Sequence, residues 1–204
     1  MGDMDAASLA VPPAAPLPVA TPLARPNDVE QASILPTSIL VAPHPLLKAR
    51  CRPVADTDIE QVRALLPRMF ASMYNAPGIG LAAPQVGVLL RLCIVDLMPD
   101  HRKAPFVLIN PAVVAESDEM ASREEGCLSL PGQYAQVVRP AHVKVRFTDE
   151  TGARREVEGE GLFGACLQHE IDHLDGVLFV DHISVLKRNM LMRRLAKDQR
   201  QKVR

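Results

Sequence analysis

The sequence predicts an α+β fold, with antiparallel strands in the middle of the chain and helices at both ends. Short runs of β-branched and aromatic residues fall between residues 91 and 158, whereas helical spacing of apolar residues occurs before and after them. This clustering disfavours an alternating βαβ fold. We expect the strands to pack around a central helix that carries an H-E-x-x-H pattern, with an N-terminal and a C-terminal helix beside them.

The composition is that of one globular domain with extensions. Of the 204 residues, 48% are apolar and 23% are charged, which are ordinary values for a globular protein. The net charge of −1 gives no indication of a DNA partner. No apolar run reaches the roughly 18 residues of a membrane span, so we expect no membrane partner. Four cysteines without a C-x-x-C pair or a preceding signal peptide do not predict a disulfide framework.

Residues 1–36 are expected to form a Pro/Ala-rich, disordered extension. They hold seven of the 18 prolines, and proline disrupts both helices and sheet ladders. The acidic residues Asp3, Asp5, Asp28 and Glu30 argue against a mitochondrial transit peptide. We assign no function to this extension.

The first predicted helix follows residue 56, with Thr57 or Asp58 as its N-cap. Apolar residues then recur with the spacing of one helical face: Ile59, Val62, Leu65, Leu66, Met69, Phe70 and Met73. Gly78 and Gly80 end this pattern.

Strands are predicted next, and two further helices follow them. The strand segments are residues 91–97, 106–115, 142–148 and 154–158, with a hairpin turn at residues 149–152. A mostly apolar helix is expected over about residues 164–174, closed by Asp175 and Gly176. The last helix starts near Ser184 and runs into a basic tail.

Residues 169–173 have the pattern H-E-x-x-H, the most informative in the chain. Residues four apart share one face of a helix, so His169 and His173 can bind one metal ion. Glu170 is then placed to take a proton from metal-bound water. The alternative is two surface histidines on a polar helix.

Two histidines do not complete a metal site, and no familiar third ligand follows them. The long zincin motif requires a third histidine where this chain has Phe179, and no glutamate occurs after Glu170. Structural and catalytic sites need at least three protein ligands. An ordinary zinc protease is therefore disfavoured.

A better third ligand lies upstream. Cys127 stands between Gly126 and Pro131 in a loop or short strand, and a thiolate is a strong ligand for Zn(II) or Fe(II). The alternative, a buried structural cysteine, is the expectation for Cys51, Cys93 and Cys166.

A glycine-rich segment, residues 78–87, offers a further group. Two glycines let the backbone approach a ligand closely, and the Gln85 amide could hold an oxyanion. A plain turn is the alternative for this segment.

The three segments together resemble the active-site motifs of the peptide deformylase family. That family carries G-φ-G-φ-A-A-x-Q, E-G-C-φ-S and H-E-x-x-H in this order, where φ is apolar, and here they are residues 78–85, 125–129 and 169–173. The resemblance implies a catalytic domain over residues 37–186, followed by a basic C-terminal helix or tail over residues 187–204.

The resemblance implies a bacterial, cytoplasmic hydrolase that removes the formyl group from the N-terminal formylmethionine of nascent proteins and releases formate. One divalent metal ion would be bound by Cys127, His169 and His173, with Fe(II) as the expected metal and Zn(II) as the alternative. Glu170 would carry the proton.

The resemblance also implies how the substrate is held. The Gln85 side chain and the Leu128 backbone N–H would bind the oxyanion. The backbone of Ile79, Gly80 and Leu128 would pair with the peptide as an added strand. Leu162 is expected in the wall of an apolar pocket for the methionine side chain.

The charge distribution indicates one further partner. Residues 187–204 contain eight Lys or Arg and one Asp, a net charge of +7, whereas residues 1–186 carry −8. The RNA-rich surface of the ribosome, from which the substrate emerges, would suit such a tail. The alternative is a solvated helix end.

Two other functions are compatible with part of the pattern. An H-E-x-x-H metalloprotease would leave Cys127 unexplained. A non-catalytic ribosome-binding relative predicts loss of Glu170, Gln85 or a metal ligand, yet all are present.

Overall fold

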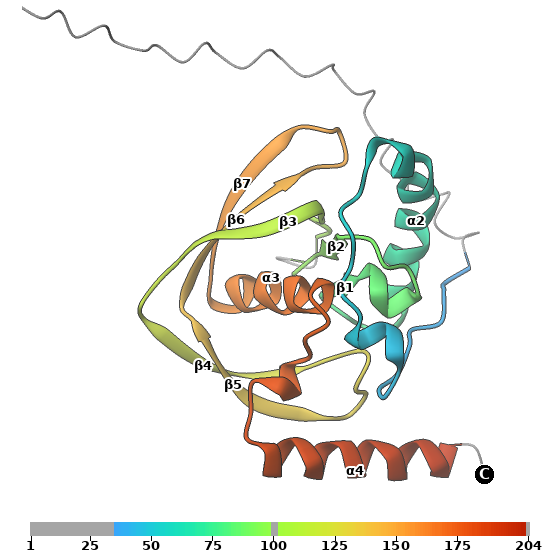
Figure 1. Cartoon of the computed structure of the whole chain (residues 1–204), viewed down its shortest axis with the longest axis vertical. Coiled ribbons are helices and arrows are strands. Elements are labelled where there is room, and N and C mark those ends of the chain that lie inside the picture. The colour runs from blue at the N-terminus through green and yellow to red at the C-terminus, as the bar shows by residue number, and fades with distance from the viewer. Residues whose placement is uncertain (1–34, 99–101, 203–204) are drawn as a thin grey trace, which may run out of the picture.

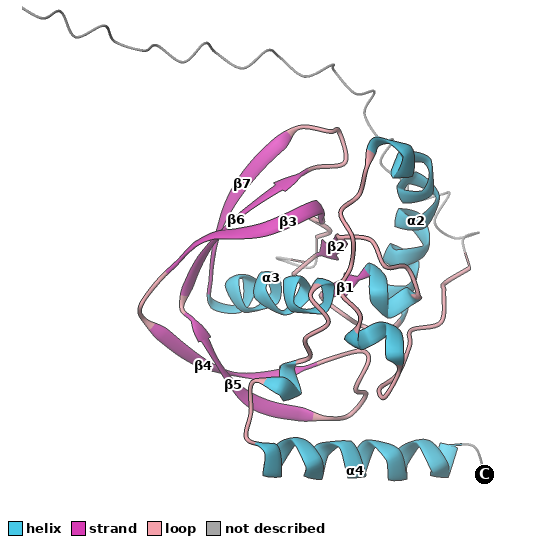
Figure 2. Ribbon diagram, viewed as in Figure 1, coloured by secondary structure: helices cyan, strands magenta, loops and turns pink. Residues whose placement is uncertain are grey.

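The computed structural model describes residues 35–98 and 102–202. Within this part of the chain it is an α+β fold with antiparallel sheets and three α-helices, as Figures 1 and 2 show. The expected fold class is therefore confirmed. Most of the predicted extension, residues 1–34, lies outside the described residues.

The strands form two antiparallel sheets. The larger has the order β1-β2-β3-β6-β7. Its strands are β1 (Gly80–Ala82), β2 (Leu92–Val95), β3 (Phe106–Glu116), β6 (His142–Thr148) and β7 (Arg154–Glu160). The smaller sheet pairs β4 (Met120–Gly126) with β5 (Tyr134–Pro140).

The four predicted strands correspond to β2, β3, β6 and β7, and the hairpin turn between the last two is also present. Gly152 in that turn has a φ of +84° and donates its N–H to the Asp149 carbonyl at 3.0 Å. Strands β1, β4 and β5 were not predicted. Most of β4 is polar and exposed, so its sequence lacks the alternation of apolar and polar residues that marks a half-buried strand.

The first helix, α2 (Ile59–Asn75), buries the apolar face that the sequence predicts. Asp58, one of the two expected residues, occupies the N-cap position, but its side chain makes no capping hydrogen bond to α2. Asp58 instead accepts hydrogen bonds from the Ala55 backbone N–H and from Arg52. Its carboxylate therefore stabilises the 3-10 turn before α2.

The helix that carries the histidines is α3 (Gly161–Leu174). It contacts β1, β2, β6 and β7, and Figure 1 shows it beside the curved sheet. It starts three residues earlier than expected, at Gly161, whose φ of +57° turns the chain out of β7. Leu167, Ile171 and Leu174 bury its apolar face in the core.

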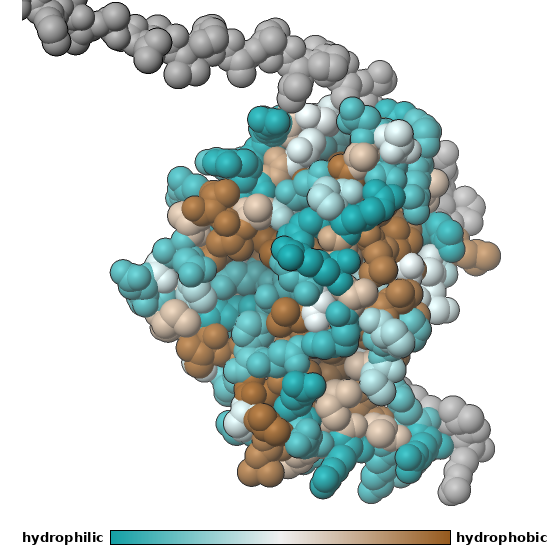
Figure 3. Space-filling model, viewed as in Figure 1, coloured by the Kyte–Doolittle hydropathy of each residue, from teal (hydrophilic) through white to brown (hydrophobic). Residues whose placement is uncertain are grey.

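The last helix, α4 (Val185–Lys202), runs along the smaller sheet (Figure 1). Leu191 and Leu195 are buried in a cluster with Val137 of β5. Figure 3 shows a hydrophobic group of atoms at the lower left, where α4 begins, and hydrophilic atoms along the rest of this edge. Among the described helices, none has both the length and the apolar character needed to cross a bilayer.

Candidate metal centre

Three donor atoms converge beside a cavity that Cys127 and His169 help to line. Cys127 follows β4 directly, and His169 and His173 lie one turn apart on α3. One donor atom from each residue lies within 4.8 Å of the other two. Cys127 Sγ is 3.2 Å from His173 Nε2. Thiolate and imidazole donors at this spacing fit a transition-metal ion.

The cluster favours the thiolate form of Cys127. Burial alone would raise the pKa of this thiol, but His173 and His169 hold it well below its usual range. The Ser129 backbone N–H also points at Sγ, 3.4 Å away. A thiolate, not a thiol, is the form that ligates metals.

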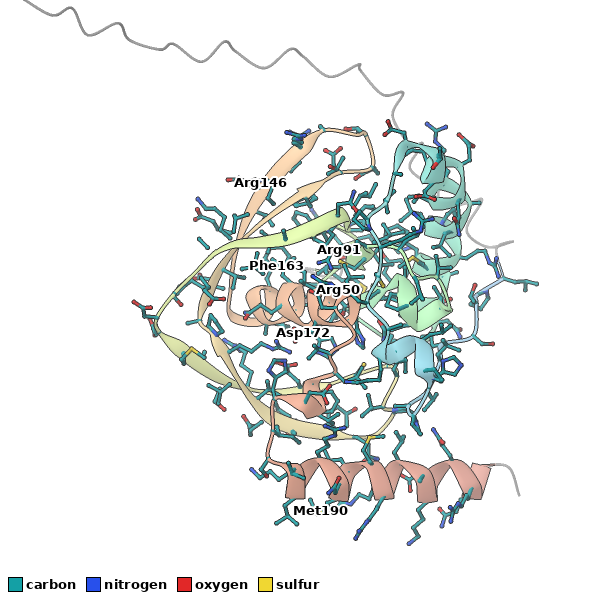
Figure 4. The ribbon with its side chains drawn as sticks, viewed as in Figure 1. Arg50, Arg91, Arg146, Phe163, Asp172 and Met190 are labelled. Atoms are coloured by element: carbon teal, nitrogen blue, oxygen red, sulfur yellow. The ribbon has the colours of Figure 1, made fainter. Side chains whose placement is uncertain are left out.

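A series of charged groups contacts the Nδ1 side of the His169 ring. Its Nδ1 lies 3.0 Å from Glu125 Oε2, and Arg139 binds both oxygens of Glu125 at 2.6 and 3.1 Å. Arg139 also donates to Asp172 of α3, labelled in Figure 4, at 2.7 Å, and His182 lies 2.7 Å from the same Asp172 oxygen. Such contacts fix the ring orientation and leave the other ring nitrogen for a metal.

Glu125 is ionised in this environment. Burial would raise its pKa, but the hydrogen bonds from His169 and Arg139 lower it to about 2. A carboxylate at this position favours the tautomer of His169 with a proton on Nδ1.

Glu170 is 3% exposed, and its Oε2 has no hydrogen-bond partner among the described residues. Burial raises the pKa of this carboxyl to about 7. A Cβ atom at Gly80 would lie 2.8 Å from Glu170 Cδ, so β1 can approach Glu170 only with glycine at this position. The site therefore contains a carboxyl suited to proton transfer near neutral pH.

Gln85 lies in the 3-10 helix Ala83–Val86 with its amide directed toward the cluster. Its Oε1 accepts the Ala82 backbone N–H at 2.8 Å. Its Nε2 lies 3.1 Å from Ser129 Oγ and 3.6 Å from Cys127 Sγ. The amide donor thus faces the donor atoms of the candidate metal centre.

A cavity of about 640 Å³ opens beside the cluster. The residues expected to contact substrate all line it, namely Ile79, Gly80, Gln85, Leu128 and Leu162. His173 is fully buried behind it. Arg123 and Tyr134 also line the cavity, although the sequence did not predict them there. Both belong to the two strands that it did not predict, so no pattern placed them near the site.

The fold and the thiolate–imidazole cluster beside a buried glutamate define a candidate metallohydrolase. Residues 36–189 match the family model described as polypeptide deformylase. The chain belongs to this family and is an enzyme of the peptide deformylase type, which confirms the resemblance found in the sequence.

Individual relatives support this assignment. The chain is 48% identical over 160 residues to a peptide deformylase of Brucella suis biovar 1 (strain 1330), covering 78% of this chain and 91% of that one. A peptide deformylase crystal structure from Legionella pneumophila has 46% identity and a TM-score of 0.78, covering 83% and 98% of the two chains. Another, from Ehrlichia chaffeensis in complex with actinonin, has 34% identity and a TM-score of 0.77, covering 82% and 99%.

Proposed function

We propose that this enzyme is a metal-dependent hydrolase that removes the formyl group from the N-terminal formylmethionine of new proteins and releases formate. The observation that carries the proposal is the buried carboxyl of Glu170, which lines the cavity beside the Cys127, His169 and His173 cluster. We place catalysis in residues 37–186 and assign no catalytic role to residues 1–36.

Cys127, His169 and His173 would hold one divalent ion. The donor set suits Fe(II), which we propose as the native metal, and also Zn(II), the alternative. A cation bound there would act as a Lewis acid on the formyl carbonyl and activate water. Metal analysis of anaerobically purified protein tests the choice, because zinc alone with full activity would contradict iron.

Glu170 would transfer the proton. It accepts a proton from the attacking water and delivers it to the amine that leaves. A pKa of about 7 lets one carboxyl serve first as base and then as acid. Without protonation of the amine, the tetrahedral intermediate would revert to substrate.

Gln85 and Leu128 would stabilise the oxyanion. The amide oxygen of Gln85 is held by Ala82, which leaves Nε2 directed toward the site. The Leu128 backbone N–H would be the second donor. Fixed donors of this kind favour the transition state because they need no reorganisation.

The substrate would bind as an extra strand. β1 is an edge of the larger sheet, and an edge strand presents unpaired backbone groups. Ile79 and Gly80 would supply these groups on one side of the peptide and Leu128 on the other. Leu162, 52% exposed at the cavity, would form part of the methionine pocket.

Formate release from formyl-Met-Ala-Ser under anaerobic, metal-replete conditions tests the function. Glu170→Gln should lower kcat by about 10²- to 10⁴-fold and keep its metal. Glu119→Gln, at an exposed position on the surface, should retain activity. No release by the wild type, or full activity of Glu170→Gln, would contradict the proposal.

We also propose that the basic residues of α4 contact the ribosome surface in the bacterial cytoplasm. Arg193, Arg194, Lys197 and Arg200 are exposed, while Leu191 and Leu195 anchor the helix to the body. The exposed cations would meet RNA phosphates.

A further inference from the structure

We propose that Arg123 makes this enzyme favour nascent chains with an acidic side chain at the third residue. The proposal rests on the proposed deformylase function and specifies its substrate class. It is carried by the position of Arg123 at the cavity and by its lack of a carboxylate partner within the described structure.

The geometry of β4 directs Arg123 into the cavity. Side chains two apart on a strand share a face, so Arg123 points the same way as Glu125, which contacts His169 on α3. Glu124 lies between them on β4, and it also lines the cavity. Arg123 Nη2 also lies only 3.4 Å from the position of a Cβ at Gly161, the first residue of α3. The guanidinium therefore lies beside the start of α3, next to Leu162.

Arg123 is exposed and carries its charge beside Glu125, whose own charge is matched. Glu125 is held by Arg139 and His169. Arg123 itself forms no ion pair with any residue that the structure describes. Beside the start of α3, the cavity thus presents an exposed cation that a substrate carboxylate can approach.

The spacing of an extended peptide matches this position. Alternate side chains of a strand lie on one side, so the third residue follows methionine on the cavity side, roughly 7 Å farther along. Leu162 precedes His169 by seven residues on α3, which is about 10 Å along the helix axis. A glutamate side chain at the third residue would extend toward Arg123 beside the start of α3. The second residue points away from it.

Paired peptides test this selectivity. We would measure kcat/KM for C-terminally amidated peptides, which have no terminal carboxylate at the third residue: formyl-Met-Ala-Glu-amide against formyl-Met-Ala-Gln-amide, and formyl-Met-Glu-Ala-amide against formyl-Met-Gln-Ala-amide. The wild type should favour glutamate at the third residue by about 2- to 5-fold, the size expected for an exposed ion pair. The preference should decrease at high salt and should be absent at the second residue.

Variants then assign the preference to one side chain. Arg123→Met, which keeps an unbranched apolar stem, should remove the preference, and Arg123→Glu should reverse it. Arg154→Gln removes the same charge at an exposed position on β7, outside the cavity, and should keep it. An identical glutamate-to-glutamine ratio in the wild type and Arg123→Met would overturn the proposal. Formyl-Met-Ala-Ser-amide, whose amidated C-terminus leaves the third residue without a carboxylate, should be deformylated by all variants, so failure of the basic function would be seen separately.

Discussion

Glu125 is the residue that joins the candidate metal centre to the rest of the fold. Its carboxylate contacts His169 on one side and receives two hydrogen bonds from Arg139 on the other. Arg139 then reaches Asp172 on α3. One side chain therefore orients a proposed metal ligand and also neutralises a buried guanidinium.

Replacing Glu125 should cost stability in a pH-dependent way. In the metal-free protein at pH 7, Glu125→Gln should lower the free energy of unfolding by about 3 kcal/mol, because Arg139 loses its buried partner. The pKa of Glu125 is lowered from 4.5 to about 2. Its stabilising contribution is thus complete above pH 4.5 and is lost as the pH falls toward 2.

Urea unfolding at pH 7 and pH 3 measures this effect. The difference between the wild type and Glu125→Gln should be smaller at pH 3. Glu119→Gln, at an exposed site, serves as the matched control and should differ little from the wild type at either pH. A difference of the same size at both pH values would show that the carboxylate charge does not carry the stabilisation.

Gly80 should be needed for activity because of the space around Glu170. An added methyl group would lie 2.8 Å from Glu170 Cδ and 3.0 Å from Cys166 Sγ. Gly80→Ala should therefore displace Glu170 and lower kcat/KM by about 10²-fold, while the metal content stays unchanged. Steady-state kinetics and metal analysis on the same preparation check this. If Gly80→Ala had the kcat/KM of the wild type, displacement of Glu170 would not impair catalysis, contrary to the prediction.

At the scale of elements, the sequence predicts those whose own residues carry a pattern. The apolar face of α2 and the alternation in β6 mark these segments locally. β4 and β5 pair mainly with each other, residue by residue from Met120↔Pro140 to Gly126↔Tyr134, and β4 is largely exposed. The polar, exposed sequence of β4 has no alternation of apolar residues, so this strand and its partner β5 were missed, and Arg123 with them.

The proposed site was predictable for a different reason. His169 and His173 share a helix face through their spacing alone. Cys127 and Gln85 come from separate segments: donor chemistry indicated Cys127 as a third ligand, and the family motifs connected both residues to the histidines. The series of contacts from Glu125 through Arg139 and Asp172 to His182 joins residues of separate elements. Neither residue spacing nor a sequence motif indicated these contacts.

Attachment of α4 should depend on Leu195, which is 1% exposed in the cluster with Val137 and Leu178. Leu195→Ala should lower the free energy of unfolding by about 2–4 kcal/mol. Met190→Ala, on the exposed part of the same helix and labelled in Figure 4, should change it by less than about 0.5 kcal/mol. Urea unfolding compares the two, and equal effects would mean that α4 is not anchored by its apolar face.

At the scale of the whole molecule, charge is divided between a basic tail and an acidic body. Residues 187–204 carry +7 and residues 1–186 carry −8. The apolar side of α4 packs against the body. Its cations therefore lie on the opposite, exposed side, along the hydrophilic edge in Figure 3. An acidic body is repelled by RNA, so contact with a polyanion would be confined to this helix.

Ribosome binding should therefore depend on salt and on α4. Replacing Arg193, Arg194, Lys197 and Arg200 by glutamine should weaken binding and make the salt dependence shallower, because fewer counterions are released. Glutamine leaves the buried Leu191 and Leu195 in place, so activity on formyl-Met-Ala-Ser should persist. Sedimentation with purified ribosomes from about 50 to 200 mM salt measures both effects. Equal affinity of the wild type and the four-fold variant across this range would exclude α4 as the ribosome contact.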